Sequence, residues 1–158
     1  MRELVKLPNA LLRQKSKPVK RIDSKIKALA SEMVQFIRLR QADDLRPIGL
    51  TACELGELVR VIAFSRNPMS TEEDIQVLIN PELVYAKSSH LVTESCLSIP
   101  DKEFTLRRHK IVKIRGLTLD GELRSFRGRG LLAQVFQHEI DHLDGILLDQ
   151  IGERRKNR

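Results

Sequence analysis

Aromatic side chains are scarce in this chain of 158 residues, which has five Phe, one Tyr and no Trp. Proteins that bind single-stranded nucleic acid stack the bases on aromatic rings, so the composition argues against a platform of that kind. The sequence also has no apolar run approaching the roughly 20 residues of a membrane helix, and its first residues show no apolar core of a secretory signal. We therefore predict no membrane contact and a location in the cytoplasm or inside an organelle.

Cysteine is rarer still, because Cys53 and Cys96 are the only two. In a cytoplasmic chain such thiols are more often inert, reactive or bound to a metal than joined in a disulfide. With 41% hydrophobic and 31% charged residues, the composition is typical of a soluble globular protein. Residues 1–158 are predicted to form a single domain.

Basic residues outnumber acidic ones, and the net charge is +7. A charge of this size is compatible with contact to nucleic acid or a ribosome, but solubility alone also explains it. Contact with a ribosome or RNA would use the basic stretch Arg107-Arg108-His109-Lys110 on the surface, together with the basic C-terminal tail. We expect at most a weak ribosome contact and no sequence-specific recognition of nucleic acid.

Hydrophobic spacing predicts a first helix that begins at Asp23 or Ser24 and ends near Arg40. Its apolar residues recur at intervals of three and four and form one face: Ile26, Leu29, Ala30, Met33, Phe36 and Ile37. A helical turn is expected before it, around residues 10–13. Short strands are predicted at residues 59–64, 77–81, 111–117 and 123–126.

Asp120-Gly121 predicts the turn between the last two strands. A second helix is expected from about Gly130 to His142, with a core face made of Leu132, Val135, Phe136 and Ile140. One helix, several strands and a further helix together predict an α+β fold.

The second predicted helix carries His138-Glu139-Ile140-Asp141-His142, an H-E-x-x-H motif. Two histidines four residues apart share one face of a helix, so both imidazoles can bind the same metal ion. Glu139 lies beside them and can act as a base on a metal-bound water. Two unrelated surface histidines on an amphipathic helix are the alternative explanation.

A catalytic site of this type needs a third protein ligand. The metzincin pattern would place a His at position 148, which is a Leu here. The upstream candidates are Cys53, His90, Cys96 and His109. We favour Cys96, because a thiolate with two imidazoles leaves the fourth position of a tetrahedral site to water. Such a ligand set suits zinc, ferrous iron, cobalt and nickel, so it does not select one metal.

Three segments resemble the peptide deformylase family. Residues 137–145 resemble its Q-H-E-x-D-H-L-x-G motif, residues 94–98 resemble its E-G-C-L-S motif, and residues 48–54 more loosely resemble a third motif that ends in Gln. The resemblance implies an α+β fold with antiparallel strands packed around a central metal-binding helix, in addition to the N-terminal helix. It also implies hydrolysis of the N-formyl group from the formyl-methionine of nascent peptides.

The resemblance further implies a division of roles in the site. Cys96, His138 and His142 would hold one divalent metal, which is ferrous iron in most members and replaceable by nickel, cobalt or zinc. Glu139 would take a proton from the metal's water and pass it to the leaving amine. The backbone N–H of Leu97 would help to stabilise the oxyanion.

Ile48, Gly49 and Ser95 would line the peptide cleft, where Ser95 replaces a family glycine. Glu54 stands where the family has a Gln that donates to the formyl oxygen. An ionised carboxylate can only accept a hydrogen bond, so Glu54 either donates in a protonated form or serves a cationic group of the substrate. A Glu on the surface of a drifted loop is the remaining alternative.

Two further residues also make the expected cleft more polar. Glu103 falls where many members have an Arg near the substrate backbone. Gln134 falls where members place an apolar residue against the methionine side chain. The C-terminal helix that helps common bacterial members to contact the ribosome is expected to be short or absent.

Three hypotheses about function follow from these residues. The first is a divergent deformylase that acts on formyl-methionyl peptides. The second is a related hydrolase that acts on another N-formyl or acyl amide with a polar or basic side chain. The third is a metal-bearing protein without activity that associates with ribosomes or RNA.

Overall fold

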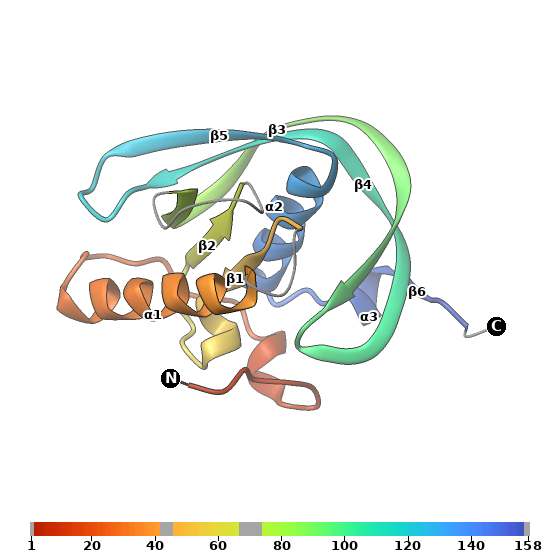
Figure 1. Cartoon of the computed structure of the whole chain (residues 1–158), viewed down its shortest axis with the longest axis horizontal. Helices are drawn as coiled ribbons and strands as arrows, with labels where there is room; N and C mark the ends of the chain where they lie inside the picture. Colours follow the sequence, from red (N-terminus) through yellow and green to blue (C-terminus); the bar gives the residue numbers. More distant parts are fainter. Residues whose placement is uncertain (1, 42–45, 67–73, 157–158) are drawn as a thin grey trace.

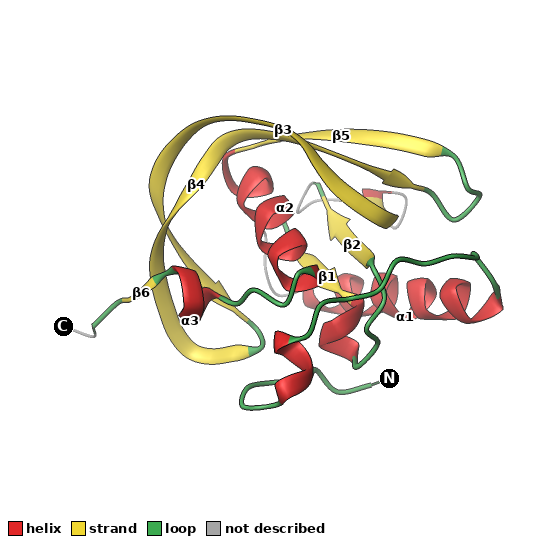
Figure 2. Ribbon diagram, turned by 180° about the vertical axis from the view of Figure 1, so that it is seen from behind, coloured by secondary structure: helices red, strands yellow, loops and turns green. Residues whose placement is uncertain are grey.

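Two long strands, joined by a tight turn, bend around a central helix (Figure 1). They are β3 (Ile75–Cys96) and β4 (Ile99–Leu117), and they pair in antiparallel register from Ile79 opposite Leu117 to Cys96 opposite Ile99. This computed structural model describes residues 2–41, 46–66 and 74–156. The central helix is α2 (Gly130–Leu143), which lies in the hollow of the curved hairpin (Figure 2).

The strands form one antiparallel sheet with the order β1-β2-β3-β4-β5, and β6 pairs with β4. The remaining elements are the 3-10 helices η1 (Ala10–Arg13) and η2 (Ala52–Leu55), the helices α1 (Ser24–Gln41) and α3 (Leu148–Ile151), and the strands β1 (Gly49–Thr51), β2 (Val61–Ser65), β5 (Leu123–Arg129) and β6 (Glu153–Arg154). The predicted α+β fold, its central helix and its N-terminal helix are therefore confirmed.

Helix α1 matches its prediction closely. Asp23 caps its N-terminus, since Oδ1 of Asp23 accepts a hydrogen bond of 3.0 Å from the backbone N–H of Ile26. The predicted apolar face packs against β1, β2 and the start of β3 in one hydrophobic cluster. This packing anchors the strand that runs into the candidate site.

The inner face of the sheet packs against α2 in a second cluster. Phe64 of β2 is its centre, with edge-on contacts to Phe126 at 5.1 Å and to Phe136 at 4.8 Å between ring centroids. The predicted core face of α2 is confirmed, because Phe136 is buried in this cluster and the partly buried Leu132, Val135 and Ile140 pack against it. The buried positions also include Ala133, Gln137, Glu139, His142 and Leu143.

Three of the four predicted strands were too short, and the fourth, predicted at residues 59–64, is observed at Val61–Ser65. Residues 82–91 and 99–110 were not expected to be strand, yet both belong to the long hairpin. Residues 82–89 are exposed throughout, so they lack the alternation of apolar and polar residues that marks a half-buried strand. Pairing with β4 holds them extended, and this tertiary contact is not visible in the local pattern.

No helix among the described residues is long and apolar enough to cross a membrane. After α2, the described residues form only the four-residue helix α3 and the short strand β6.

Candidate active site

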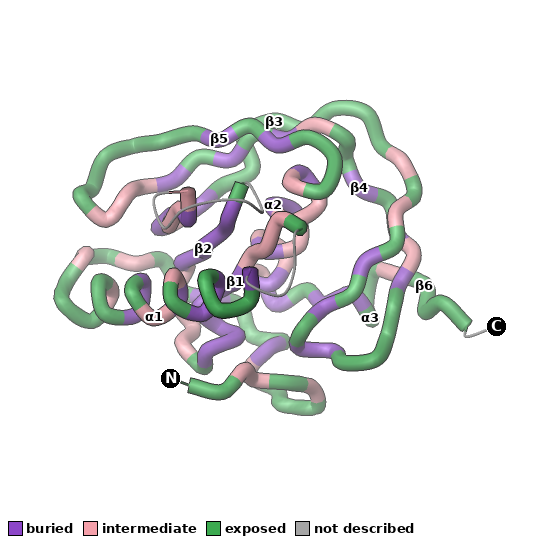
Figure 3. The backbone as a smooth tube through the Cα atoms, viewed as in Figure 1, coloured by how far each residue is buried: buried purple, intermediate pink, exposed green. Residues whose placement is uncertain are grey.

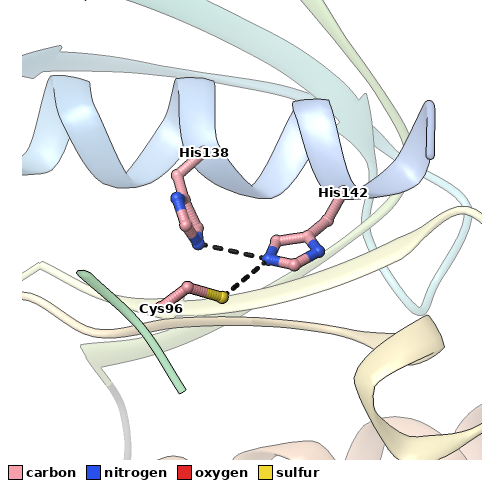
Figure 4. Close-up of side chains that lie close together, drawn as sticks. All are labelled: Cys96, His138 and His142. Carbon is pink, nitrogen blue, oxygen red and sulfur yellow. Dashed lines mark hydrogen bonds between the residues drawn. The ribbon is translucent and has the colours of Figure 1, made fainter. Parts of the chain in front are cut away.

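Helix α2 and the end of β3 bring three metal-ligating side chains together (Figure 4). His138 and His142 lie one turn apart on α2, and Cys96 ends β3. The Nε2 atom of His142 lies 3.2 Å from Sγ of Cys96 and 3.2 Å from Nε2 of His138. All three ligand atoms lie within 4.8 Å of one another.

The geometry and chemistry of this group fit one divalent ion. Bonds of about 2.0–2.3 Å at tetrahedral angles place neighbouring ligand atoms roughly 3.3–3.6 Å apart. Burial lowers the pKa of His142 to about 4, so its imidazole is neutral and has a lone pair to donate. Burial also raises the pKa of the Cys96 thiol, and a bound cation would supply the charge that stabilises the thiolate.

The other candidate ligands lie elsewhere. The Sγ atom of Cys53 lies 3.1 Å from Oγ1 of Thr51, and burial raises its pKa to about 12. The side chain of His109 is exposed on β4. Among the described residues, only Cys96, His138 and His142 form a group that could hold a metal ion.

A buried carboxylate orients His138. Oε2 of Glu94 lies 3.3 Å from Nδ1 of His138, and Arg108 donates to both oxygens of Glu94, at 2.8 Å and 3.0 Å. Arg108 also donates to Asp141 on α2 at 2.6 Å. Although burial alone would raise the pKa of Glu94, its hydrogen bonds to His138 and Arg108 lower it overall. Such a carboxylate fixes the tautomer and ring orientation of a metal-binding histidine.

Arg108 was expected in a basic surface stretch, and this expectation was wrong. The side chain is only 6% exposed and lies between two carboxylates. A clue was present in the sequence, because a charged residue within the alternating apolar stretch of β4 must have a partner when it is buried. The neighbouring residues Arg107 and His109 are exposed.

The side chain of Gln137 links α2 to β4 through hydrogen bonds. Its side-chain oxygen accepts from the backbone N–H of His109 at 2.8 Å, and its amide donates to the backbone oxygens of His109 and Ala133 at 3.0 Å and 2.9 Å. These bonds fix the start of the H-E-x-x-H segment against the strand that carries Arg108. This role of Gln137 was not predicted from the sequence.

Glu139 is buried beside the three ligands. Its Oε2 atom makes no hydrogen bond with any described residue. Burial, together with the nearby charges of Glu54 and Glu94, raises the pKa of Glu139 well above its ordinary value. A Cβ atom on Gly49 would lie 2.5 Å from Oε1 of Glu139, so the glycine on β1 makes room for this carboxylate.

Glu54 is also buried, so the alternative of a surface residue in a drifted loop is excluded. Thr51 donates to its Oε2 atom from both the backbone N–H (2.9 Å) and the side-chain hydroxyl (3.0 Å), and Ser98 donates to Oε1 at 3.2 Å. Oε1 also lies 3.8 Å from Nε2 of His142. The sequence T-x-x-E at residues 51–54 is a capping box, which was a signal for this geometry.

A cleft of about 420 Å³ opens beside these groups. It is lined by every site residue that the sequence predicted except His142, which is buried beneath it: Ile48, Gly49, Glu54, Ser95, Cys96, Leu97, Glu103, Gln134, His138 and Glu139. Leu97 lies at the turn between β3 and β4, and Ser95 faces Glu103 across the same hairpin. Glu103 lies on the exposed rim of the cleft, where its Oε2 atom is 3.7 Å from Nη1 of Arg155.

Comparisons with known proteins give one consistent result. The family model described as polypeptide deformylase matches residues 1–157. A peptide deformylase of Dictyoglomus thermophilum is 36% identical over 148 residues, which cover 94% of this chain and 90% of that protein.

Solved structures agree. A peptide deformylase from Legionella pneumophila superposes with a TM-score of 0.86 at 29% identity, covering 96% of this chain and 85% of that one. A peptide deformylase from Acinetobacter baumannii, solved with Met-Ala-Ser bound, gives a TM-score of 0.81 at 29% identity and covers 96% of this chain and 98% of that one. The chain with this Cys-His-His site therefore belongs to the polypeptide deformylase family, whose members are metal-dependent hydrolases that remove the formyl group from nascent peptides.

Proposed function

We propose that this cleft hydrolyses the N-formyl group of formyl-methionyl peptides and that Glu139 moves the proton. The observation that carries the proposal is the buried Oε2 atom of Glu139, which has no hydrogen-bond partner among the described residues and lies beside three metal-ligating atoms. A buried carboxylate without a partner is costly for folding. A catalytic task explains why it is there, whereas a protein that only binds metal has no use for it.

Cys96, His138 and His142 would hold one divalent ion, and ferrous iron is our first choice, with nickel, cobalt and zinc compatible with the same ligands. When bound, such an ion acts as a Lewis acid and lowers the pKa of water in its coordination sphere. Glu94 and Arg108 keep His138 in the orientation that this role requires.

Glu139 accepts a proton from the attacking water, and its raised pKa suits a group that must then give the proton away. The water oxygen bonds to the formyl carbon, and the bond from this carbon to the amino nitrogen of the methionine breaks. Glu139 delivers the proton to the leaving amine, and formate is released. The backbone N–H of Leu97, which lies at the hairpin turn and lines the cleft, would donate to the formyl oxygen as it gains charge.

Ile48, Gly49 and Ser95 flank the path of the peptide along the cleft. Glu54 reaches the same space but, when ionised, can only accept hydrogen bonds. Thr51 and Ser98 already donate three hydrogen bonds to this carboxylate. We therefore assign Glu54 the place of a missing donor and expect the deformylation rate to be lower than a Gln at this position would allow.

Formate release from formyl-Met-Ala-Ser tests the proposal, with acetyl-Met-Ala-Ser as the matched control. Anaerobically purified protein with about one bound metal per chain should release formate, and chelation should abolish the release. The acetyl peptide should react far more slowly. Protein that holds stoichiometric metal but releases no formate would contradict the proposal.

A second substrate class is favoured by one observation. Gln134 lines the cleft between Leu131 and His138 and forms no side-chain hydrogen bond with any described residue. Its free amide is suited to a polar first side chain in the formylated substrate. A panel of formyl-X-Ala-Ser peptides, with X as Met, Gln or Lys, separates the two classes. If the parent protein prefers the Met peptide and this preference is unchanged in Gln134→Leu, substrates with a polar first side chain are excluded.

A further inference from the structure

The face of β3, β4 and β5 that points away from α2 carries a concentrated positive charge. Val112, Ile114 and Phe126 mark the inner face, where they are buried against α2. Side chains alternate along a strand, so the residues between them point outward. We call the outward set the outer basic face: Lys87, Arg107, Lys113, Arg115, Arg127 and Arg129, all of which are exposed.

The strand register places these cations close together. Lys113 lies opposite Arg127 on β5, and Arg129 and Lys87 lie on either side of Ile111. Neighbouring strands are about 4.8 Å apart, and outward residues along one strand follow at roughly 6.6 Å. Both spacings are shorter than the screening length of about 8 Å at physiological salt, so the cations reinforce one another's field.

Few carboxylates offset this charge. The sequence has no Asp or Glu at residues 104–119 or 123–138. Within the described residues, Arg115 is the only member of the outer basic face with a carboxylate partner, Glu82 at 3.8 Å, and that pair is largely exposed. Arg107 donates to Ser89, and this bond leaves its charge uncompensated.

The described elements leave this face open to solvent. Helix α2 lies on the inner side of the hairpin and α1 lies across the molecule from β5 (Figure 1). Most of β5 is exposed, and only Phe126 and Gly128 are buried (Figure 3). The sheet also fixes the positions of the charges, because their backbones are held by ladder hydrogen bonds on both sides of β4.

We infer that the outer basic face docks onto the phosphate backbone of double-helical RNA. Fixed cations at regular spacing match the fixed phosphates of a helix better than the fluid headgroups of a membrane. Tyr85 is the only aromatic ring of Phe, Tyr or Trp type at an outward register position of this face, so stacking on single-stranded bases has no platform. The choice of RNA rests on the proposed function, because nascent peptides emerge from an RNA-rich particle.

Binding to a labelled RNA duplex of about 20 base pairs, measured by fluorescence anisotropy between 50 and 200 mM salt, tests this inference. The variant combines Lys113→Gln, Arg127→Gln and Arg129→Gln. We expect its affinity at the lowest salt to fall at least tenfold and its slope of log affinity against log salt to become shallower by about 3. The matched control combines Lys20→Gln, Lys25→Gln and Lys27→Gln, which are exposed near and on α1.

Both triple variants lower the net charge by the same amount, and the control should bind RNA nearly as the parent does. Formate release from a free formyl tripeptide should be unchanged in both variants, which separates a failure of this inference from a failure of the proposed function. If RNA affinity falls equally in both variants, the effect comes from net charge alone, and the inference is overturned. Preferential binding to vesicles that contain phosphatidylserine, lost in the β4–β5 variant, would assign the face to a membrane and also overturn it.

Discussion

Glu54 is a buried carboxylate inside the candidate site. Its carboxylate accepts hydrogen bonds from Thr51 and Ser98 and lies 3.8 Å from Nε2 of His142. A glutamine keeps the capping box, because the motif accepts either residue. Its amide would also supply donors that the carboxylate lacks.

Glu54→Gln should therefore raise the rate of formate release from formyl-Met-Ala-Ser. Loss of one oxyanion donor costs on the order of 10²–10³ in rate in other enzymes, so a gain of about tenfold or more is expected. Steady-state kinetics with metal-replete protein measures it. An unchanged or lower rate would show that Glu54 is not a lost donor.

Glu139 has a consequence for stability as well as for catalysis. Burial and neighbouring charges raise its pKa in the folded protein above the ordinary value of 4.5. The folded state therefore favours the protonated form, and stability decreases as the pH rises through the raised pKa. Glu139→Gln removes this effect and keeps the size of the side chain.

In metal-free protein, Glu139→Gln should raise the melting temperature at pH 8. It should have little effect at pH 4, where the carboxyl is protonated in both the folded and the unfolded state. Thermal unfolding monitored by circular dichroism at the two pH values checks this. An equal increase of the melting temperature at both pH values would point to a cause other than the ionisation of Glu139.

Strand β1 is the element that brings the backbone next to the catalytic helix. An alanine at Gly49 would place its Cβ 2.5 Å from Oε1 of Glu139 and 2.7 Å from Cγ1 of Val135. Gly49→Ala should displace Glu139 by a few tenths of an ångström or more and reduce formate release by about 100-fold, because small misplacements are costly at a reacting centre.

The control for this prediction is Gly121→Ala in the turn before β5. Gly121 has a φ of +80° and no neighbour within 4 Å of an added Cβ. This change should cost about 1 kcal/mol of stability through backbone strain while the activity stays unchanged. If both variants lose activity equally, the loss at Gly49 reflects stability and not the position of Glu139.

The β3–β4 hairpin carries both Cys96 and the ion pair that supports His138. Glu94→Gln removes the negative charge that pairs with Arg108, and it weakens the contact that orients His138. We expect metal affinity to fall by about 10–100-fold and stability to fall by about 3 kcal/mol, because Arg108 loses Glu94, the buried one of its two carboxylate partners.

Metal competition with a chelator and urea unfolding measure the two effects. Glu82→Gln is the matched control, since it also removes a β3 carboxylate that faces an arginine of β4, but at an exposed site. An exposed pair contributes less than about 1 kcal/mol. Metal affinity equal to that of the parent in Glu94→Gln would contradict the supporting role.

At the scale of the whole molecule, local patterns in the sequence were sufficient for α1, α2 and the turn at Gly121. They also indicated which residues to consider as metal ligands, because a helix fixes the spacing of His138 and His142, and chemistry then favours Cys96. The hairpin and α2 bring these three side chains together in a group that could hold a metal ion, and their role as ligands stays a prediction.

Contacts between distant segments were not predictable in the same way. The burial of Arg108 depends on Glu94 and Asp141, which are 14 and 33 residues away in sequence. The long strands depend on pairing with each other, since residues 82–89 have no buried face of their own. The role of Gly49 is visible only when β1 lies against α2.

The most direct test of the account measures formate and metal on the same samples of the parent protein and Glu139→Gln. The parent should release formate from formyl-Met-Ala-Ser with about one metal per chain. Glu139→Gln should keep the metal and lose at least 100-fold in rate, which is the range of general acid–base catalysis. Retained activity in Glu139→Gln with full metal would contradict the central claim that this buried carboxylate moves the proton.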